Sequence, residues 1–125
     1  MICRGIRGAT TVDSDTQEDI LSAARDLLQK MIQANSIDAE MVACAIFTTS
    51  PDLNAEFPAV AARQLGWTQV AMLCGHEMAV PGSLPMCLRI LLLVNTDKSS
   101  SEINHIYIKG AKNLRTFPDW GDLGK

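Results

Sequence analysis

The chain has 125 residues, of which 47% are hydrophobic and 20% are charged. This length suits one domain with one core, and so high an apolar fraction excludes a disordered chain. The formal net charge of −3 argues against a basic surface for nucleic acid or for an anionic membrane.

The first part of the chain predicts a strand followed by a long helix. The stretch RGIRGATTV, residues 4–12, occupies the place of a first strand. Residues 13–35 have a helical period, with Ser14 and Gln17 in the spacing of a capping box. The apolar side chains on one face of this helix are Ile20, Leu21, Ala24, Leu27, Leu28, Met31 and Ile32.

The middle of the chain predicts a buried strand, a loop and a short helix. MVACAIFTT, residues 41–49, is apolar and β-branched and ends at the turn sequence SPD. Pro58 suits the first turn of a helix over residues 58–65, which Gly66 would end.

Three more strands are predicted in the second half. Residues 68–74 and 86–96 are both expected to be central strands, and the second is apolar on both faces. Residues 105–108 alternate polar and apolar side chains and predict a last strand. The tail, residues 116–125, is expected to be mobile.

These elements predict a mixed α/β fold: a single small domain whose mixed β-sheet packs against one long helix and one or two short ones. Strands that are apolar on both faces need cover on both faces, and so few helices cannot supply it. A symmetric homo-oligomer, with sheet faces or edges meeting between subunits, is the simplest source of the missing layer.

The sequence also indicates a compartment. The longest apolar run, ILLLV after Arg89, is far shorter than a membrane span, and the segment MICRGIR lacks the apolar core of a signal peptide. The four cysteines form no CxxC pair, which favours reduced thiols. We therefore expect a cytoplasmic protein without a membrane partner.

Two arginines stand out. Arg89 lies inside CLRILLLV, where a strand would bury it, and an unpaired buried cation costs several kcal/mol because arginine cannot lose its proton. Either an acid of the chain forms a structural ion pair with Arg89, or Arg89 binds a carboxylate or phosphate ligand. Arg7 poses a similar choice: Gly5 and Gly8 leave room for a ligand beside it, or it is an ordinary exposed arginine.

The stretch CGHEM, residues 74–78, lies where a strand ends and functional loops begin. Zinc binding by Cys74 and His76 lacks further ligands at recognisable spacing, so we expect no metal site. A Cys74 nucleophile lacks a group that would orient His76, and a buried thiol beside an exposed Glu77 carboxylate is the plainer interpretation. Together, the arginines, the carboxylate, the thiol and the tyrosine suit a binding pocket for a small polycarboxylate. Any chemistry there would depend on positioning and electrostatics.

Several separated motifs together resemble one enzyme family. They are RGIRGATTV, SPDLNAEFPA, CGHEM, VPGSLPMCLRILLLVNT and HIYIKGAKNLR. In this order they cover nearly the whole chain and are similar to the monofunctional chorismate mutases of the trimeric pseudo-α/β-barrel type. The resemblance implies a chorismate mutase domain over residues 1–115, a homotrimer with three active sites between neighbouring subunits, and no cofactor. It also implies the rearrangement of chorismate to prephenate, on the way to phenylalanine and tyrosine.

The resemblance further implies roles for individual residues. Arg7 and Tyr107 would hold a substrate carboxylate, and Arg89 would contact a carboxylate and the ether oxygen of the breaking C–O bond. Glu77 and Cys74 would lie near the ring hydroxyl and the ring that becomes electron-poor. The other matches are pocket-wall residues from a neighbouring subunit and residues of the covering tail: Phe57, Ala59 and Arg63, then Leu114 and Arg115.

Two positions depart from the family pattern. Val60 stands where some relatives carry lysine, which implies a less basic pocket rim. Thr116 stands where the family often has proline, which leaves the contribution of the tail open. Two other classes of protein also remain: a small imine or enamine deaminase on a similar trimeric scaffold, and a non-catalytic sensor of a carboxylate metabolite. Neither readily accounts for the full set of arginines, carboxylate and tyrosine.

Overall fold

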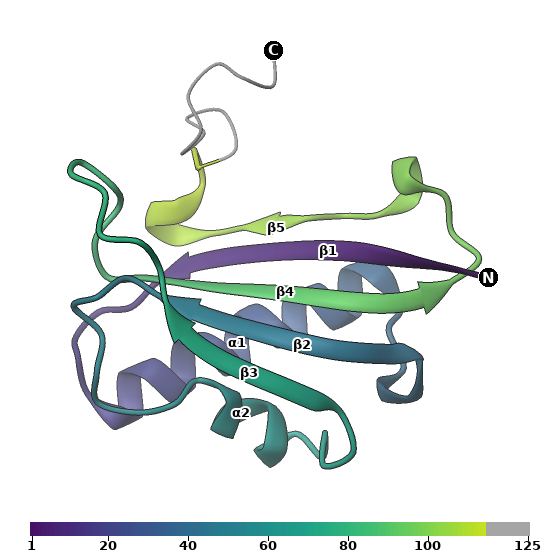
Figure 1. The fold of residues 1–125 in the computed structure, drawn as a ribbon, viewed down its shortest axis with the longest axis horizontal. Helices are drawn as coiled ribbons and strands as arrows, with labels where there is room; N and C mark the ends of the chain where they lie inside the picture. Colours follow the sequence, from purple (N-terminus) through teal and green to yellow (C-terminus); the bar gives the residue numbers. More distant parts are fainter. Residues whose placement is uncertain (115–125) are drawn as a thin grey trace.

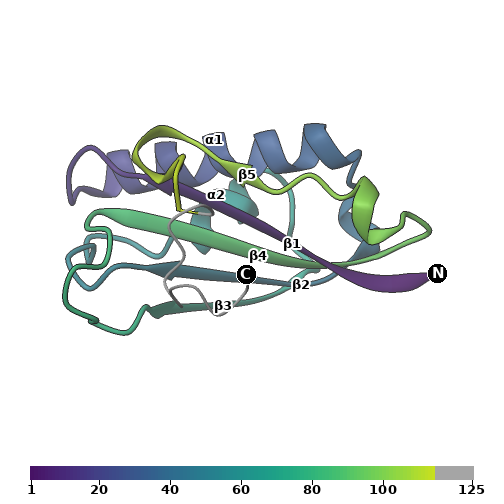
Figure 2. The same cartoon turned by 90° about the horizontal axis from the view of Figure 1, so that it is seen from above.

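A computed structural model describes residues 1–114 of the protein. Its strands form one mixed sheet in the order β3-β2-β4-β1-β5. Figure 1 shows this sheet face-on with the helices behind it, and Figure 2 shows the two layers from above. The strands are β1 Ile2–Thr11, β2 Val42–Thr49, β3 Ala71–His76, β4 Cys87–Thr96 and β5 Ile106–Tyr107.

The long helix α1, Gln17–Asn35, confirms the helix predicted from the 3.6-residue period. Its predicted apolar face packs against the sheet, and Leu27, Leu28 and Met31 are completely buried there. Gly8 of β1 lies directly under this helix, where a Cβ atom would come within 2.4 Å of the Met31 sulfur. The close approach of helix and strand therefore depends on glycine at this position.

The predicted capping box at the start of α1 is wrong. The N-cap is Thr16, whose hydroxyl accepts a hydrogen bond from the Asp19 N–H at 3.2 Å. Ser14 lies two residues further out, and its hydroxyl donates instead to the Asp19 carboxylate. Thr16 takes the role because it immediately precedes the first helical residue, so its side chain can reach an amide of the first turn.

The short helix α2, Ala59–Gln64, begins after Pro58 and ends before Gly66, as predicted. Gly66 has φ +96°, a left-handed conformation that favours glycine at the end of a helix. Neither α1 nor α2 is long and apolar enough to cross a bilayer. The other helical segments are short 3₁₀ turns: η1 Ala39–Met41, η2 Ser100–Glu102 and η3 Lys109–Ala111.

The order of the strands confirms one expectation and corrects another. β4 is central, as predicted, because it pairs antiparallel with both β1 and β2. The strand predicted over residues 68–74 is not central: it forms at Ala71–His76 as β3, the edge strand beside β2. It takes this place because the chain crosses over through α2 and returns parallel to β2. The last strand, β5, is only two residues long, because Lys109, at φ +53°, turns the chain into η3.

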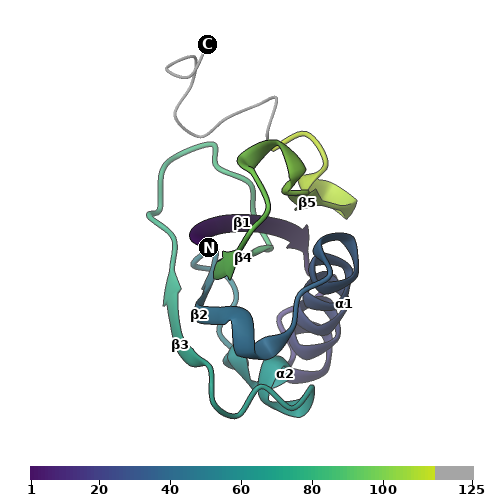
Figure 3. The ribbon, with the colours of Figure 1, turned by 90° about the vertical axis from the view of Figure 1, so that its right-hand side faces the viewer.

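Alternate residues of β4 define two faces of the sheet. Leu88, Ile90 and Leu92 point toward the helices and are at most 1% exposed; we call this side the inner face. The residues between them point to the opposite side, which we call the outer face. Figure 3 shows that α1 and α2 both lie on the other side of the sheet. The strand registers assign these residues to the outer face: Gly5, Arg7 and Ala9 of β1, Cys44, Ile46 and Thr48 of β2, Ala71, Leu73 and Gly75 of β3, and Arg89, Leu91 and Leu93 of β4.

Candidate active site

One end of the outer face, where β3 ends and β4 begins, carries a compact charged cluster. The Nε of Arg89 lies 3.9 Å from Oε2 of Glu77, and their side chains are 28% and 36% exposed. Glu77 directly follows β3, where its backbone N–H donates to the carbonyl of Thr49 at 2.7 Å. Thr48 lies opposite Arg89 in the sheet, and its hydroxyl donates to the same Oε2 of Glu77. We call Thr48, Glu77 and Arg89 the Arg89 cluster.

Arg7 and Tyr107 lie on the same face as the Arg89 cluster. Ala9 of β1 pairs with Arg89 on one side and with Tyr107 on the other, so these three residues form one row across the sheet. Arg7 lies two residues before Ala9, with its side chain exposed on the same face. Its backbone N–H donates to Nδ1 of His105 at 2.9 Å, which ties β1 to the segment before β5.

The C-terminal segment covers the row of Ala9 and Tyr107. Leu114 is 9% exposed and belongs to a small apolar cluster with Ala9, Cys87 and Ala111, against which Tyr107 packs. Leu114 therefore lies in the cluster that packs against Tyr107, which is predicted to bind a carboxylate. Arg115, predicted to act with it, lies outside the described residues, as do Thr116 and the rest of the tail.

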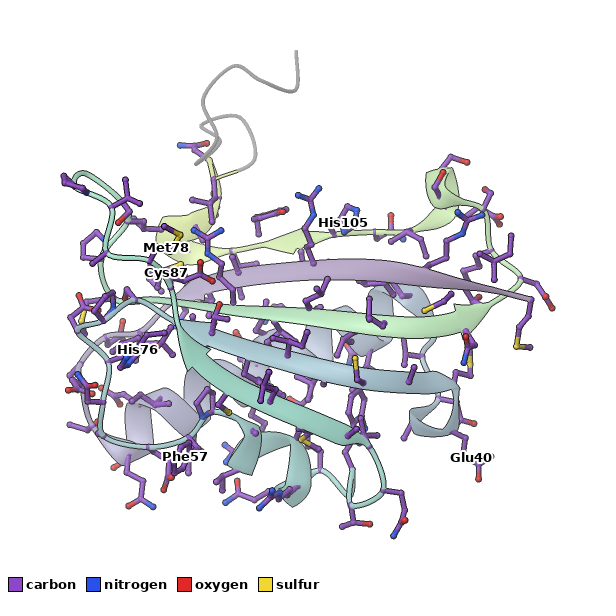
Figure 4. The ribbon with its side chains drawn as sticks, viewed as in Figure 1. Glu40, Phe57, His76, Met78, Cys87 and His105 are labelled. Carbon is purple, nitrogen blue, oxygen red and sulfur yellow. The ribbon has the colours of Figure 1, made fainter. Side chains whose placement is uncertain are left out.

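A second group of predicted site residues lies on the other side of β3. Cys74 pairs with the fully buried Phe47, so its side chain points to the inner face. With Phe57 and His76 it lines a cavity of about 300 Å³ between the end of β3 and the loop before α2. Phe57 is 68% exposed at this opening. Figure 4 shows Phe57 outside the β3 edge of the sheet, near the start of α2.

The surroundings of Cys74 argue against a cysteine nucleophile. Burial raises the pKa of its thiol, whereas the backbone N–H of Ala59 and the charge of Arg63 act in the opposite direction. The net shift is upward, so the thiol stays protonated at neutral pH. The ring of His76 is engaged elsewhere, with its Nε2 3.0 Å from the carbonyl of Leu53. Over residues 1–114, no group of three His, Cys, Asp or Glu side chains is placed to hold a metal ion.

In one chain, the predicted site residues thus form two separate groups. The outer-face group contains Arg7, Glu77, Arg89, Tyr107 and Leu114. The second group contains Phe57, Ala59, Arg63 and Cys74, on the α2 side of β3.

Cys74 and Glu77 were both expected near the substrate ring, and within one chain the structure directs their side chains to different sides of β3. Sequence reasoning overlooked Thr48. Strand alternation could have placed the Thr48 hydroxyl on the face opposite Phe47. Its approach to Glu77 could not be foreseen, because that contact depends on the pairing of β2 with β3 and β4.

Comparison with known proteins identifies what the chain resembles. Residues 3–120 match the family model of type I chorismate mutase. The chain is 50% identical over 113 residues to the chorismate mutase AroH of Thermus thermophilus, covering 90% of this chain and 93% of that protein. It is 44% identical over 116 residues to the chorismate mutase AroH of Bacillus subtilis, covering 92% and 91%. The solved structure of a Clostridium thermocellum chorismate mutase superposes with a TM-score of 0.87 at 45% identity, covering 89% of this chain and 99% of that one.

Proposed function

This chain belongs to the type I chorismate mutase family, and from that premise we propose how its residues act and how its chains assemble. It is a chorismate mutase, an isomerase of aromatic amino-acid biosynthesis. The reaction turns chorismate into prephenate within one molecule, as one C–O bond breaks and one C–C bond forms. Because no proton or electron needs to be transferred, the protein's task is to fold a flexible dianion and to stabilise the charge that separates.

Arg7, Tyr107 and Arg89 are the groups that hold the substrate. Arg7 and Tyr107 bind one carboxylate from the β1 side of the outer face, and the guanidinium of Arg89 binds a carboxylate and the ether oxygen. Planar guanidinium forks fix the orientation of a carboxylate as well as its position, which suits a substrate that must be held in a folded conformation. The shared row of Ala9, Arg89 and Tyr107 on one face supports this assignment.

The 3.9 Å approach of Arg89 to Glu77 is the observation that carries the proposed mechanism. It brings a positive and a negative group together on a partly exposed surface, where one bound molecule could touch both. A donor aimed at the ether oxygen gains strength as negative charge grows there, and so favours the transition state over the ground state. Glu77, beside it, stabilises the positive character of the ring and binds the ring hydroxyl.

The second part of the proposal is a homotrimer with active sites between subunits. In one chain the edge strand β3 lies between the outer-face group and the group around Phe57, so the two groups face different sides of that strand. A neighbouring subunit resolves this by bringing its Phe57, Ala59 and Arg63 to the first chain's Arg89 cluster, with Cys74 on the same side as Phe57. The exposed apolar surface of the outer face, including Leu73 at 66% exposure, supports such contacts.

The proposal also covers location and partners. We assign the enzyme to the cytoplasm, with chorismate as its ligand and without nucleic-acid or membrane partners. The net charge of −3 supports the lack of nucleic-acid and membrane partners, because binding to polyanions needs a basic surface.

The direct test of the function mixes the purified protein with chorismate and follows the loss of its ultraviolet absorbance. We expect rapid loss at micromolar enzyme and a trimeric mass by light scattering. Unchanged absorbance would reject the mutase, and protection from melting without turnover would indicate a carboxylate sensor instead. A monomeric mass at full activity would reject the shared site.

Mixing two inactive variants tests the shared site more sharply. Arg89→Ala removes the ether-oxygen donor, whereas Phe57→Asp places a negative charge on the other side of the site, against a dianion. After subunit exchange, about a quarter of the sites in random trimers combine two intact halves, so activity should reappear. If each site belonged to one chain, every site would keep a defect and the mixture would remain inactive.

A further inference from the structure

Thr48 is the one member of the Arg89 cluster that has no part in the function proposed above. It lies on β2 directly opposite Arg89 of β4, with both side chains on the outer face. Its hydroxyl donates to Oε2 of Glu77, the same oxygen that Arg89 Nε approaches at 3.9 Å. Thr48 thus contacts the carboxylate from the neighbouring strand, at the oxygen nearest the arginine.

The separation between Arg89 and Glu77 requires an explanation. A direct N–H···O bond between a guanidinium and a carboxylate would bring the two atoms to about 2.7–3.2 Å. The observed 3.9 Å is longer, although the two charges attract each other across a half-buried surface. If the carboxylate moved onto the guanidinium, it would occupy donor groups that the substrate carboxylate and ether oxygen require. Something must therefore hold the carboxylate where it is.

Two contacts fix the position of Glu77. Its backbone N–H donates to the carbonyl of Thr49, which anchors the start of the side chain to the end of β2. The Thr48 hydroxyl then fixes the far end of the side chain. Threonine is well suited to this role because its branched Cβ restricts χ1, so the hydroxyl is held in one direction.

We propose that Thr48 is a positioning residue of the mutase reaction. Its hydroxyl holds the Glu77 carboxylate beside Arg89 without letting the two groups form a closed ion pair. The guanidinium then stays directed toward the substrate, and the carboxylate stays in place for the ring. This inference rests on the function proposed above for Glu77 and Arg89.

If Thr48 had only a structural role, the shape of its side chain would matter and its hydroxyl would not. Thr48 is only partly buried, on the face that neither α1 nor α2 covers, and valine has the same branched shape and a similar preference for strands. Thr48→Val therefore removes the hydroxyl while keeping the packing. Thr48→Ser keeps the hydroxyl and loses the methyl group, so the two variants separate the hydrogen bond from the shape.

The first experiment measures kcat and KM for chorismate in both variants. Loss of a hydrogen bond to a charged group should lower kcat about 10- to 100-fold in Thr48→Val, with a smaller change in KM. Thr48→Ser should restore most of this loss. The matched control is Thr10→Val: Thr10 is also a strand threonine, but it is buried on the inner face, where its hydroxyl donates to the Thr11 carbonyl over a long 3.4 Å. Its kcat should remain close to that of the unmodified enzyme.

The second experiment asks whether Thr48 acts through Glu77. In a Glu77→Ala background, Thr48→Val should lower kcat less than about twofold, because the hydroxyl has lost its partner. An equal loss in both backgrounds would show a merely structural role and overturn the inference, as would a Thr48→Ser variant as impaired as Thr48→Val. If Glu77→Ala is strongly impaired but Thr48→Val is not, only this inference fails. If Glu77→Ala keeps full activity, the role proposed for Glu77 fails as well.

Discussion

The two faces of the sheet differ in how complete they are within one chain. On the inner face, Ile6, Phe47 and Leu92 are at most 1% exposed beneath the helices. On the outer face, Leu73 is 66% exposed and the Arg89 side chain 28%. The same strands supply both faces, so the difference does not come from local structure. It teaches that the inner face is complete within one chain, whereas the outer face leaves apolar and charged side chains exposed, as the proposed trimer with shared sites requires.

The largest effect should come from a charge in the apolar part of the outer face. Leu73→Glu should abolish assembly of the proposed trimer and reduce activity to background, because the new carboxylate would be buried unpaired between subunits and the proposed sites combine two subunits. Light scattering and chorismate turnover measure the two effects. Gln29→Glu is the control, since Gln29 is exposed on α1, and it should assemble normally. A fully active monomeric Leu73→Glu would show that the outer face needs no partner.

The second effect concerns the charged end of the outer face. Arg89→Lys keeps the charge but loses the planar fork, so kcat should fall about 10²–10³-fold, as for other lost donors at a developing oxyanion. The melting temperature should change little, because the Arg89 side chain is 28% exposed and lysine keeps its charge. Near-normal turnover in this variant would refute the ether-oxygen role.

The third effect compares adjacent residues of β4 on the two faces. Leu92→Ala should lower the free energy of unfolding by about 2–5 kcal/mol, because Leu92 is completely buried in the inner core. Leu93→Ala, on the outer face, should cost less in unfolding but should weaken trimer assembly. Urea denaturation and light scattering separate these outcomes. If both variants lost the same free energy of unfolding and both assembled normally, the proposed difference between the two faces would be wrong.

The smallest effect concerns the turn that leads into β4. Met86 adopts φ +51°, and its backbone N–H donates to Asp52 at 3.0 Å. A hydrogen bond from the Ser50 side chain, together with this N–H, holds the pKa of Asp52 below its ordinary value of 3.8. Asp52→Asn should therefore lower the melting temperature at neutral pH by about 2–4 °C.

The sign of this contribution fixes its pH dependence. Because the pKa of Asp52 is lower in the folded state, its stabilisation is fully present above pH 3.8 and is lost as the pH falls through the lower folded value. Melting curves of the two proteins should converge in that acidic range. A difference that persisted unchanged well below pH 3.8 would mean that the charge of Asp52 is not the cause.

The sequence by itself determined the elements whose signal is local. The 3.6-residue period gave α1, apolar runs gave β2 and β4, and Pro58 and Gly66 bounded α2. The sequence also marked Arg89 as the residue that needs explanation, because a cation inside an apolar strand must meet an anion. Burial patterns of this kind can be read along a single stretch of chain.

The tertiary structure alone decided which of these stretches meet. It placed β3 at the edge of the sheet, brought Thr48 and Glu77 to Arg89, and sent Cys74 to the other side of β3. Local pattern could not supply these facts, because strand order and register depend on hydrogen bonds between segments far apart in the sequence. Whether two residues share a site is set by that pairing, and a shift of one residue in register would move a side chain to the opposite face.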